Sequence, residues 1–419
     1  MSKNGTEQGS WQSRAAMPAL VLALGFLFNV VARGVGDSYM VFLLPLSQEF
    51  GWQRSAMTSV YSALMVVSGL AAPLAGMVFE RWGPRVLYGA GLLLLAAGYS
   101  LAGHLHQLWQ FYLCIGLLGG LGSAAIGMVP ASALISRWFT RRMSTAIGLA
   151  YAGFGCGSLF IVPLVQAVID REGWRQAYQA IGTALMVALP LALLLPWRRM
   201  GAGASGTSAV RPAPRPAGDR SPLVCALRDR RFWLMVQIMF FTAVGMYLVI
   251  VQSVAYLVDI GLTPLKAAGV FGTAGMLSVV GVSSAGWLAD RYGHRRAALV
   301  SFAGTLMGVA CLYAMSWGPE PALLAGYVLL FGVCQGARGP LIASLSARLF
   351  PGPGQPTIYG AIYACMAVGS GLGALLSGVL HDLTGGYRAT FVLSGICMSL
   401  AAAPFLWSRA IVPPDRPAA

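Results

Sequence analysis

The chain has 419 residues, of which 57% are hydrophobic and only 10% are charged, and its formal net charge is +15. Soluble domains carry about 25% charged residues, so this composition excludes a soluble enzyme, a disordered chain and, despite the positive charge, a nucleic-acid-binding domain. The seven cysteines show no metal-ligand or disulfide spacing, which excludes a secreted disulfide scaffold.

Twelve segments are long and apolar enough to cross a membrane. A spanning helix needs roughly 20 apolar residues, since the hydrocarbon core is about 30 Å thick and each helical residue rises about 1.5 Å. Lipid offers no partner for an unpaired peptide group, so each segment is predicted to be helical. The first is too long for a cleaved signal peptide. The predicted spans are 17–44, 55–79, 86–105, 108–136, 144–168, 176–196, 232–258, 264–288, 297–317, 322–347, 356–380 and 389–407.

Basic residues gather on one side of these spans. With the N-terminus placed inside, 21 of the 28 Lys and Arg residues fall on the inner side. This bias follows the positive-inside rule, so both termini are predicted to be cytoplasmic, in what we expect to be a bacterial inner membrane. The same charge favours contact with the headgroups of anionic membrane lipids.

A stretch rich in Gly, Ala, Ser, Pro and Arg separates the sixth span from the seventh. It has no apolar period and is predicted to be a flexible cytoplasmic linker over residues 200–231. The chain therefore divides into an N-terminal bundle of six helices, 17–199, and a C-terminal bundle of six helices, 232–407. Short cytoplasmic tails are predicted at 1–16 and 408–419.

The two halves repeat one another at an offset of 210 to 213 residues. Asp170 with Gly173-Trp174-Arg175 is echoed by Asp382 with Gly386-Tyr387-Arg388, and Arg137-Trp-Phe139 by Arg348-Leu-Phe350. A longer match joins Gly76-Met-Val-Phe-Glu80-Arg81-Trp-Gly83-Pro-Arg85 to Gly286-Trp-Leu-Ala-Asp290-Arg291-Tyr-Gly293-His-Arg295. Duplicated halves around a midplane site are typical of secondary transporters.

These motifs carry a family resemblance. The acidic-Arg-x-Gly-x-Arg loops after the second and eighth spans resemble the signature of the major facilitator superfamily. The stretch Trp138-Phe-Thr-Arg141-Arg142-Met-Ser-Thr-Ala-Ile-Gly148-Leu-Ala-Tyr-Ala-Gly153 is similar to the signature of its monocarboxylate transporter and oxalate/formate antiporter branch. The resemblance implies an all-α membrane fold of twelve helices in two pseudo-symmetric six-helix bundles. It also implies that the first, fourth, seventh and tenth spans line a central cavity.

The resemblance further implies a gating role for the charged loop residues, which clamp adjacent helices in the outward-open state and release them as the halves rock. The alternative is that they only mark topology, because exposed ion pairs contribute about 0–1 kcal/mol. We expect the gating role for Glu80, Arg81, Arg85, Asp290, Arg291 and Arg295.

With Lys266 counted in the outer loop, three charged residues lie inside spans: Arg33 and Asp37 in the first and Arg338 in the tenth. A charge at that depth costs at least about 2.5 kcal/mol, so each needs a partner or a wet cavity. Both arginines lie about 24 Å along their helices, near mid-membrane. If both face one cavity, their planar donor forks favour an organic anion.

We therefore predict that Arg33 and Arg338 bind a small organic anion. The alternative for Arg338 is packing against backbone carbonyls freed by Pro340. Supporting contacts are expected from Asn29, Tyr247, Gln335 and Tyr363.

Asp37 follows Arg33 by four residues, which places the two on one helix face. Asp37 either neutralises Arg33 or carries the coupled proton, and the two roles are compatible. Relatives in this branch carry charged residues within the eighth and eleventh helices, whereas here the interiors of those spans hold none. The specific acid is therefore not predicted.

The leading hypothesis is a secondary transporter that acts as a functional monomer. It moves a small organic anion, with a monocarboxylate the expected class, by alternating access coupled to protons or to anion exchange. The alternatives are an efflux pump for a lipophilic or cationic compound, with Asp37 as its counter-charge, and a non-transporting membrane sensor. An enzyme is not expected, and neither is a cofactor, because the chain has no phosphate-binding loop and no catalytic cluster.

Overall fold

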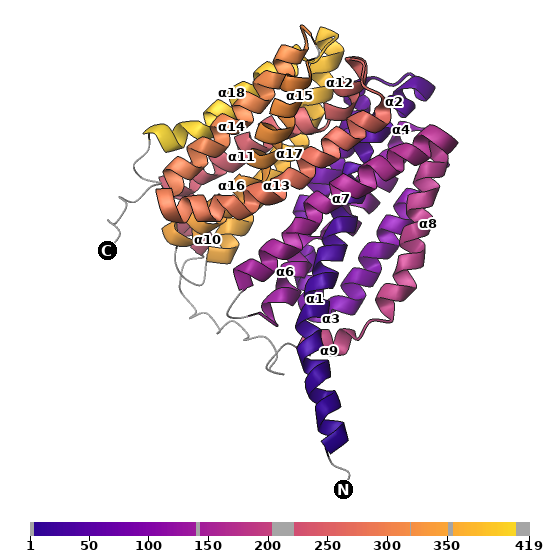
Figure 1. Ribbon diagram of the computed structural model, residues 1–419, viewed down its shortest axis with the longest axis vertical. Coiled ribbons are helices and arrows are strands. Elements are labelled where there is room, and N and C mark those ends of the chain that lie inside the picture. Colours follow the sequence, from indigo (N-terminus) through magenta and orange to yellow (C-terminus); the bar gives the residue numbers. More distant parts are fainter. Residues whose placement is uncertain (1–3, 140–142, 203–221, 319, 351–354, 408–419) are drawn as a thin grey trace.

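The computed structural model describes residues 4–139, 143–202, 222–318, 320–350 and 355–407. Within these ranges every regular element is a helix. Figure 1 shows two groups of helices lying side by side, the earlier part of the chain in indigo to magenta and the later part in salmon to yellow.

The first group follows the first six predicted spans. It contains α1 (Asn4–Asp37), α2 (Tyr39–Phe50), α3 (Arg54–Ala102), α4 (Leu108–Phe111), η1 (Tyr112–Gly119), α5 (Gly120–Ile126), α6 (Met128–Ser136), α7 (Met143–Glu172) and α8 (Trp174–Leu193). The second group contains α11 (Arg230–Ile250), α12 (Ser253–Asp259), α13 (Pro264–Tyr292), α14 (His294–Met315), α15 (Pro321–Gly326), η2 (Tyr327–Phe331), α16 (Gly332–Leu349), α17 (Gln355–Thr384) and α18 (Arg388–Trp407).

Eleven helical stretches in the described part of the chain are long and apolar enough to span a membrane. One of them, α3, contains 49 residues and is broken at Gly83, whose φ of 82° and ψ of 172° are not helical. Glycine adopts positive φ without the steric cost that other residues meet. Because α3 holds the second and third predicted spans on either side of Gly83, the eleven stretches agree with the twelve predicted spans.

The duplication is visible in the backbone as well as in the sequence. Gly293 separates α13 from α14 with a φ of 85°, as Gly83 divides α3 with a φ of 82°. The fourth and tenth spans each pass through a π-helical stretch, η1 and η2. Such stretches are rare in helices, so their recurrence at related positions reflects the repeat.

The predicted tail and linker contain more helix than expected. Helix α1 already begins at Asn4, while α9 (Trp197–Ala202) and α10 (Pro222–Leu227) overlap the predicted linker. Side chains of the bundle hold α9, because Trp138 Nε1 donates to the Met200 carbonyl at 2.7 Å and Trp197 stacks on Tyr88. Residues 203–221 of the linker and the C-terminal tail, 408–419, lie outside the described residues.

Two long crossings join the halves, α3 on α17 and α7 on α13, and the shorter helix α2 also packs on α12. Small residues permit the close approach. A methyl group added at Gly69 of α3 would overlap Ala367 of α17, and one added at Gly155 of α7 would overlap Gly275 and Met276 of α13.

The same helices separate toward the end that carries Glu80. Residues seven apart lie on one helix face, so Gly76 and Gly360 continue the faces of Gly69 and Ala367. A methyl group added at Gly76, at Gly360 or at Gly148 would meet none of the described residues within 4 Å. The halves therefore touch from the Arg54 end to mid-depth and diverge beyond it.

Candidate functional site

The last turn of α1 carries an ion pair. Arg33 Nε donates to Asp37 Oδ2 at 2.9 Å, and the spacing of four residues on one helix face produces this contact. Asp37 is 1% exposed. The same Oδ2 atom accepts from Ser158 Oγ of α7 at 2.6 Å. The buried carboxylate is thus held by two donors from two helices.

Arg33 also reaches across to the second half of the chain. Its Nη1 donates to the Tyr247 hydroxyl of α11 at 3.2 Å, and its side chain keeps 28% exposure. The guanidinium is therefore the part of the ion pair that solvent reaches.

That exposed side faces a cavity of about 150 Å³. A water molecule occupies about 30 Å³ in the liquid, so the space suits a few waters or one small organic molecule. Arg33, Asp37, Tyr247 and Tyr363 supply polar groups, and the apolar wall includes Met65, Met128, Phe154 and Met366. The cavity combines one accessible cation with hydroxyl donors and an apolar wall.

Two other residues predicted to support binding lie away from this cavity. Asn29 is fully buried and donates to the carbonyls of Gly25 at 2.9 Å and Ala150 at 3.2 Å, which ties α1 to α7. Gln335 donates to the Ala274 carbonyl at 2.9 Å, which ties α16 to α13. Both amides are used in helix packing.

Arg338 is also absent from the cavity, so the expectation that two arginines share one site is wrong for this structure. Its side chain is 3% exposed and points into the second half, where Nη1 donates to Thr305 Oγ1 at 3.0 Å. Nη2 contacts Met246 Sδ at 2.9 Å, and the guanidinium lies 5.0 Å from the Phe302 ring centre. Within the described chain no carboxylate pairs with it, and Nε has no partner.

The predicted gating residues lie at the separated end. Glu80, Arg81, Arg85, Arg291 and Arg295 are exposed, and among the described residues none of them forms an ion pair. Arg81 lies over the Trp82 ring and Arg291 over the Trp287 ring. Arg295 donates to the Leu406 carbonyl at 3.1 Å. The side chain of Asp290 lies outside the described residues.

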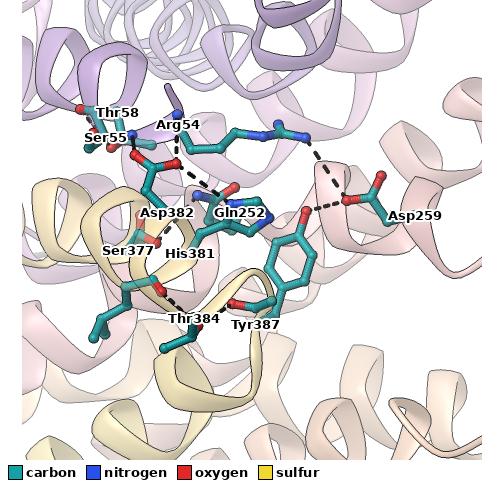
Figure 2. Close-up of polar contacts among 12 residues, drawn as sticks. Arg54, Ser55, Thr58, Gln252, Asp259, Ser377, His381, Asp382, Thr384 and Tyr387 are labelled. Atoms are coloured by element: carbon teal, nitrogen blue, oxygen red, sulfur yellow. Dashed lines mark hydrogen bonds and ion pairs between the residues drawn. The ribbon is translucent and has the colours of Figure 1, made fainter. Parts of the chain in front are cut away.

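The opposite end of the crossing is closed by polar contacts between the halves (Figure 2). Asp382 of α17 accepts from the backbone N–H groups of Arg54 and Ser55 at the start of α3. Arg54 Nη2 lies 3.9 Å from Asp259 Oδ2, and Tyr387 donates its hydroxyl to the same carboxylate. Burial, together with that hydrogen bond, raises the pKa of the Tyr387 hydroxyl, so it remains a neutral donor.

Sequence reasoning missed two groups beside the cavity. Ser158 holds Asp37, but a serine inside an apolar helix gives no signal of its own. Tyr61 of α3 is fully buried with its ring centre 6.3 Å from that of Tyr247, and its hydroxyl has no partner within the described chain. Only the three-dimensional packing identifies either residue.

Comparison with known proteins places the chain in a family. The family model described as Major Facilitator Superfamily matches residues 22–337 and 285–419. The chain is 31% identical to monocarboxylate transporter 13 of Bos taurus over 381 residues, which cover 90% of this chain and 85% of the relative. It is 32% identical to monocarboxylate transporter 11 of Homo sapiens over 393 residues, which cover 90% and 79%.

Solved structures show the same fold. A bacterial homologue of the human lysosomal transporter Spinster, in an inward-facing and occupied conformation, superposes with a TM-score of 0.75 at 14% identity, covering 93% of this chain and 96% of the other. Its unoccupied inward-facing form gives a TM-score of 0.71 at 15% identity, covering 94% and 98%. The twelve-helix fold expected from the sequence is therefore confirmed.

Proposed function

The chain belongs to the major facilitator superfamily and is a membrane transporter related to the monocarboxylate transporters; on this premise we propose that it carries a small monocarboxylate together with a proton. The related transporters 11 and 13 supply the substrate class, which their names state. Arg33 binds the carboxylate, and Asp37 takes up the proton.

The observation that carries this proposal is the exposure of Arg33 to the cavity. Nε is taken by Asp37 and Nη1 by Tyr247, while Nη2 has no partner within the described chain. A guanidinium with free donors in a low-dielectric cavity favours an anion, because charge-assisted hydrogen bonds to a carboxylate are strong. Tyr247 and Tyr363 both line the cavity, and their hydroxyls can donate to the second carboxylate oxygen.

Charge balance supports the coupled proton. Arg33 and Asp37 together are neutral, so an incoming carboxylate leaves one uncompensated negative charge near mid-membrane. Such a charge costs several kcal/mol in a buried site. A proton bound at Asp37 restores neutrality while Arg33 turns to the substrate.

The crossings support alternating access. The halves touch from the Arg54 end to Gly69 and separate by Gly76, so the cavity lies on the side of the Glu80 loop. If that loop is cytoplasmic, as the distribution of basic residues predicts, this is an inward-facing state. Transport then requires the reverse arrangement, in which the Arg54 end opens.

Anion exchange without protons is the second candidate. Asp37 Oδ2 already accepts from Arg33 and Ser158, an arrangement that also suits a permanent structural ion pair. In that case one anion replaces another at Arg33, and no proton moves. Efflux of a cation is disfavoured, because the solvent-exposed charge of the cavity is Arg33.

The remaining parts of the proposal concern the setting of the transporter. We place it in a bacterial inner membrane with both termini cytoplasmic, in contact with anionic lipid headgroups and functional as a monomer. The excess of basic residues on one side supports the orientation and the lipid contact.

The deciding experiment is uptake of radiolabelled monocarboxylates and dicarboxylates into proteoliposomes, with and without an inward proton gradient. Wild type is compared with Arg33→Gln and with Arg228→Gln, a matched loss of an exposed arginine outside the cavity. We expect gradient-driven monocarboxylate uptake in wild type and Arg228→Gln and none in Arg33→Gln. Undiminished uptake by Arg33→Gln would refute the anion site, and gradient-independent exchange would favour the second candidate.

A further inference from the structure

The start of α3 is capped by a residue of the other half. Gln53, which precedes the helix, makes no side-chain cap. Instead Asp382 Oδ1 accepts from the Arg54 N–H at 3.0 Å, and Asp382 Oδ2 accepts from the Ser55 N–H at 2.8 Å. A carboxylate at this position satisfies donors that a helix start leaves unpaired and interacts favourably with the helix dipole.

A second carboxylate binds the same segment from the side. The Arg54 guanidinium, 12% exposed, lies between α3 and Asp259 at the end of α12 (Figure 2). Tyr387 donates to Asp259, and His381 Nδ1 lies 3.8 Å from Asp382. We refer to Arg54, Ser55, Asp259, Asp382 and Tyr387 together as the α3–α17 clasp.

Helices α3 and α17 pack closely next to the clasp, which brings the Asp382 carboxylate into contact with the start of α3. Gly378 lies one turn before Asp382, and a methyl group there would overlap Ser55 and Thr58. A methyl group at Gly371, two turns before Gly378, would overlap Val66 and lie tightly against Ser62. The clasp therefore sits at the outer end of a continuous contact between the halves.

Among the residues that the structure describes, the duplicated crossing of α7 with α13 has no such arrangement. Asp170, the counterpart of Asp382, accepts from Gln166 of its own helix at 2.7 Å. Helix α13 begins with Pro264, which has no N–H to donate, and Thr263 before it makes no side-chain cap. The α3–α17 and α7–α13 crossings thus differ at this end, and the packing of duplicated helices alone does not account for the clasp.

We propose that Asp382 holds the Arg54 end of the transporter closed and that its release from the start of α3 is the step that opens this end. This inference rests on the proposed transport cycle. Separation of α3 from α17 breaks both N–H contacts of Asp382 and parts Arg54 from Asp259. Within the described part of the chain no such contacts oppose separation of α7 from α13, so the contact between α3 and α17 sets the balance between the two states.

The test measures the distance between the halves, with spin labels on cysteines at Gln53 and Leu383, both exposed, in a background lacking the seven native cysteines. Asp382→Asn keeps the size of the side chain and removes its charge and one acceptor. We expect a longer-distance population that rises about tenfold relative to wild type, in line with the loss of charge-assisted hydrogen bonds. Asp170→Asn, the matched change at the α7–α13 crossing, should leave the distribution of distances unchanged.

Ser55→Pro provides an independent variant. Proline is tolerated in the first turn of a helix and here removes one N–H while Asp382 stays intact. It is expected to shift the distances in the same direction as Asp382→Asn. An unchanged distribution in both variants, or an equal shift in Asp170→Asn, would overturn the proposal. The distances need no substrate, so a failed clasp is distinguished from a wrong transport assignment, which the uptake assay reports separately.

Discussion

Asp37 and Ser158, which lie on different helices and 121 residues apart, share a hydrogen bond of 2.6 Å inside the first half of the chain. Ser158 also stands at the crossing with the second half, because a methyl group added at Gly275 of α13 would overlap its Cβ. The serine therefore touches both the proposed proton site and the surface along which the halves move.

Ser158→Ala is expected to reduce gradient-driven uptake. The carboxylate of Asp37 loses one of its two hydrogen-bond donors, and with it the contact that fixes its position against α7. Uptake should fall about tenfold, in line with the loss of one hydrogen bond to a charged group, while Ser158→Thr, which retains the hydroxyl, stays near wild type. Initial uptake rates in proteoliposomes under an inward proton gradient check this. An undiminished rate in Ser158→Ala would show that this hydrogen bond is not needed for transport.

Asp37→Asn tests the proton role directly. The amide is nearly the same size but does not take up the coupled proton. We expect gradient-driven uptake to fall at least about a hundredfold, because the buried anion now lacks its neutralising proton, while exchange of internal for external substrate continues. Counterflow and net uptake are measured on the same preparation. Net uptake that still follows the proton gradient would contradict the assignment.

Arg33→Lys separates charge from geometry. Lysine keeps the positive charge of the cavity but lacks the planar fork that binds Asp37, Tyr247 and a carboxylate together. We expect KM for the substrate to rise about tenfold with the proton dependence retained. Concentration series of uptake rates give KM and the maximal rate separately. An unchanged KM would show that the substrate does not use the fork.

The spans, the family and the Arg33–Asp37 pair were predictable, since apolar length, duplicated motifs and a spacing of four residues are local signals. The position of Arg338 was not. Its depth along α16 follows from counting residues, but its direction depends on how that helix is rotated, and packing against Thr305 and Met246 decides the rotation. The hydrogen bond that the Arg54 N–H donates to Asp382 joins residues 328 apart in the chain, and no local pattern indicates it.

Arg338→Met tests whether Arg338 acts in packing, as its buried position indicates, or in substrate binding, as the sequence predicted. Methionine matches the contacts with Met246 and Met398, and replacement of an unpaired buried charge by an apolar side chain of similar length is often neutral or stabilising. We expect uptake within about twofold of wild type and a melting temperature that does not fall. Lost uptake at an unchanged melting temperature would instead indicate that Arg338 reaches the substrate in another conformation, as the sequence suggested.

Gly69→Ala tests whether close contact of α3 with α17 holds the Arg54 end closed. The added methyl group meets Ala367 well inside contact distance, whereas Gly76→Ala, two turns along the same face, adds a methyl group to open space. Both changes favour helix by about 0.5–1 kcal/mol, so their difference isolates the contact between the halves. Spin labels at Gln53 and Leu383 should report that the fraction of molecules open at the Arg54 end increases in Gly69→Ala. The fraction should not change in Gly76→Ala. Equal distances in the two variants would mean that the helices shift locally around Gly69 while the Arg54 end stays closed. The closed state would then depend on the clasp alone.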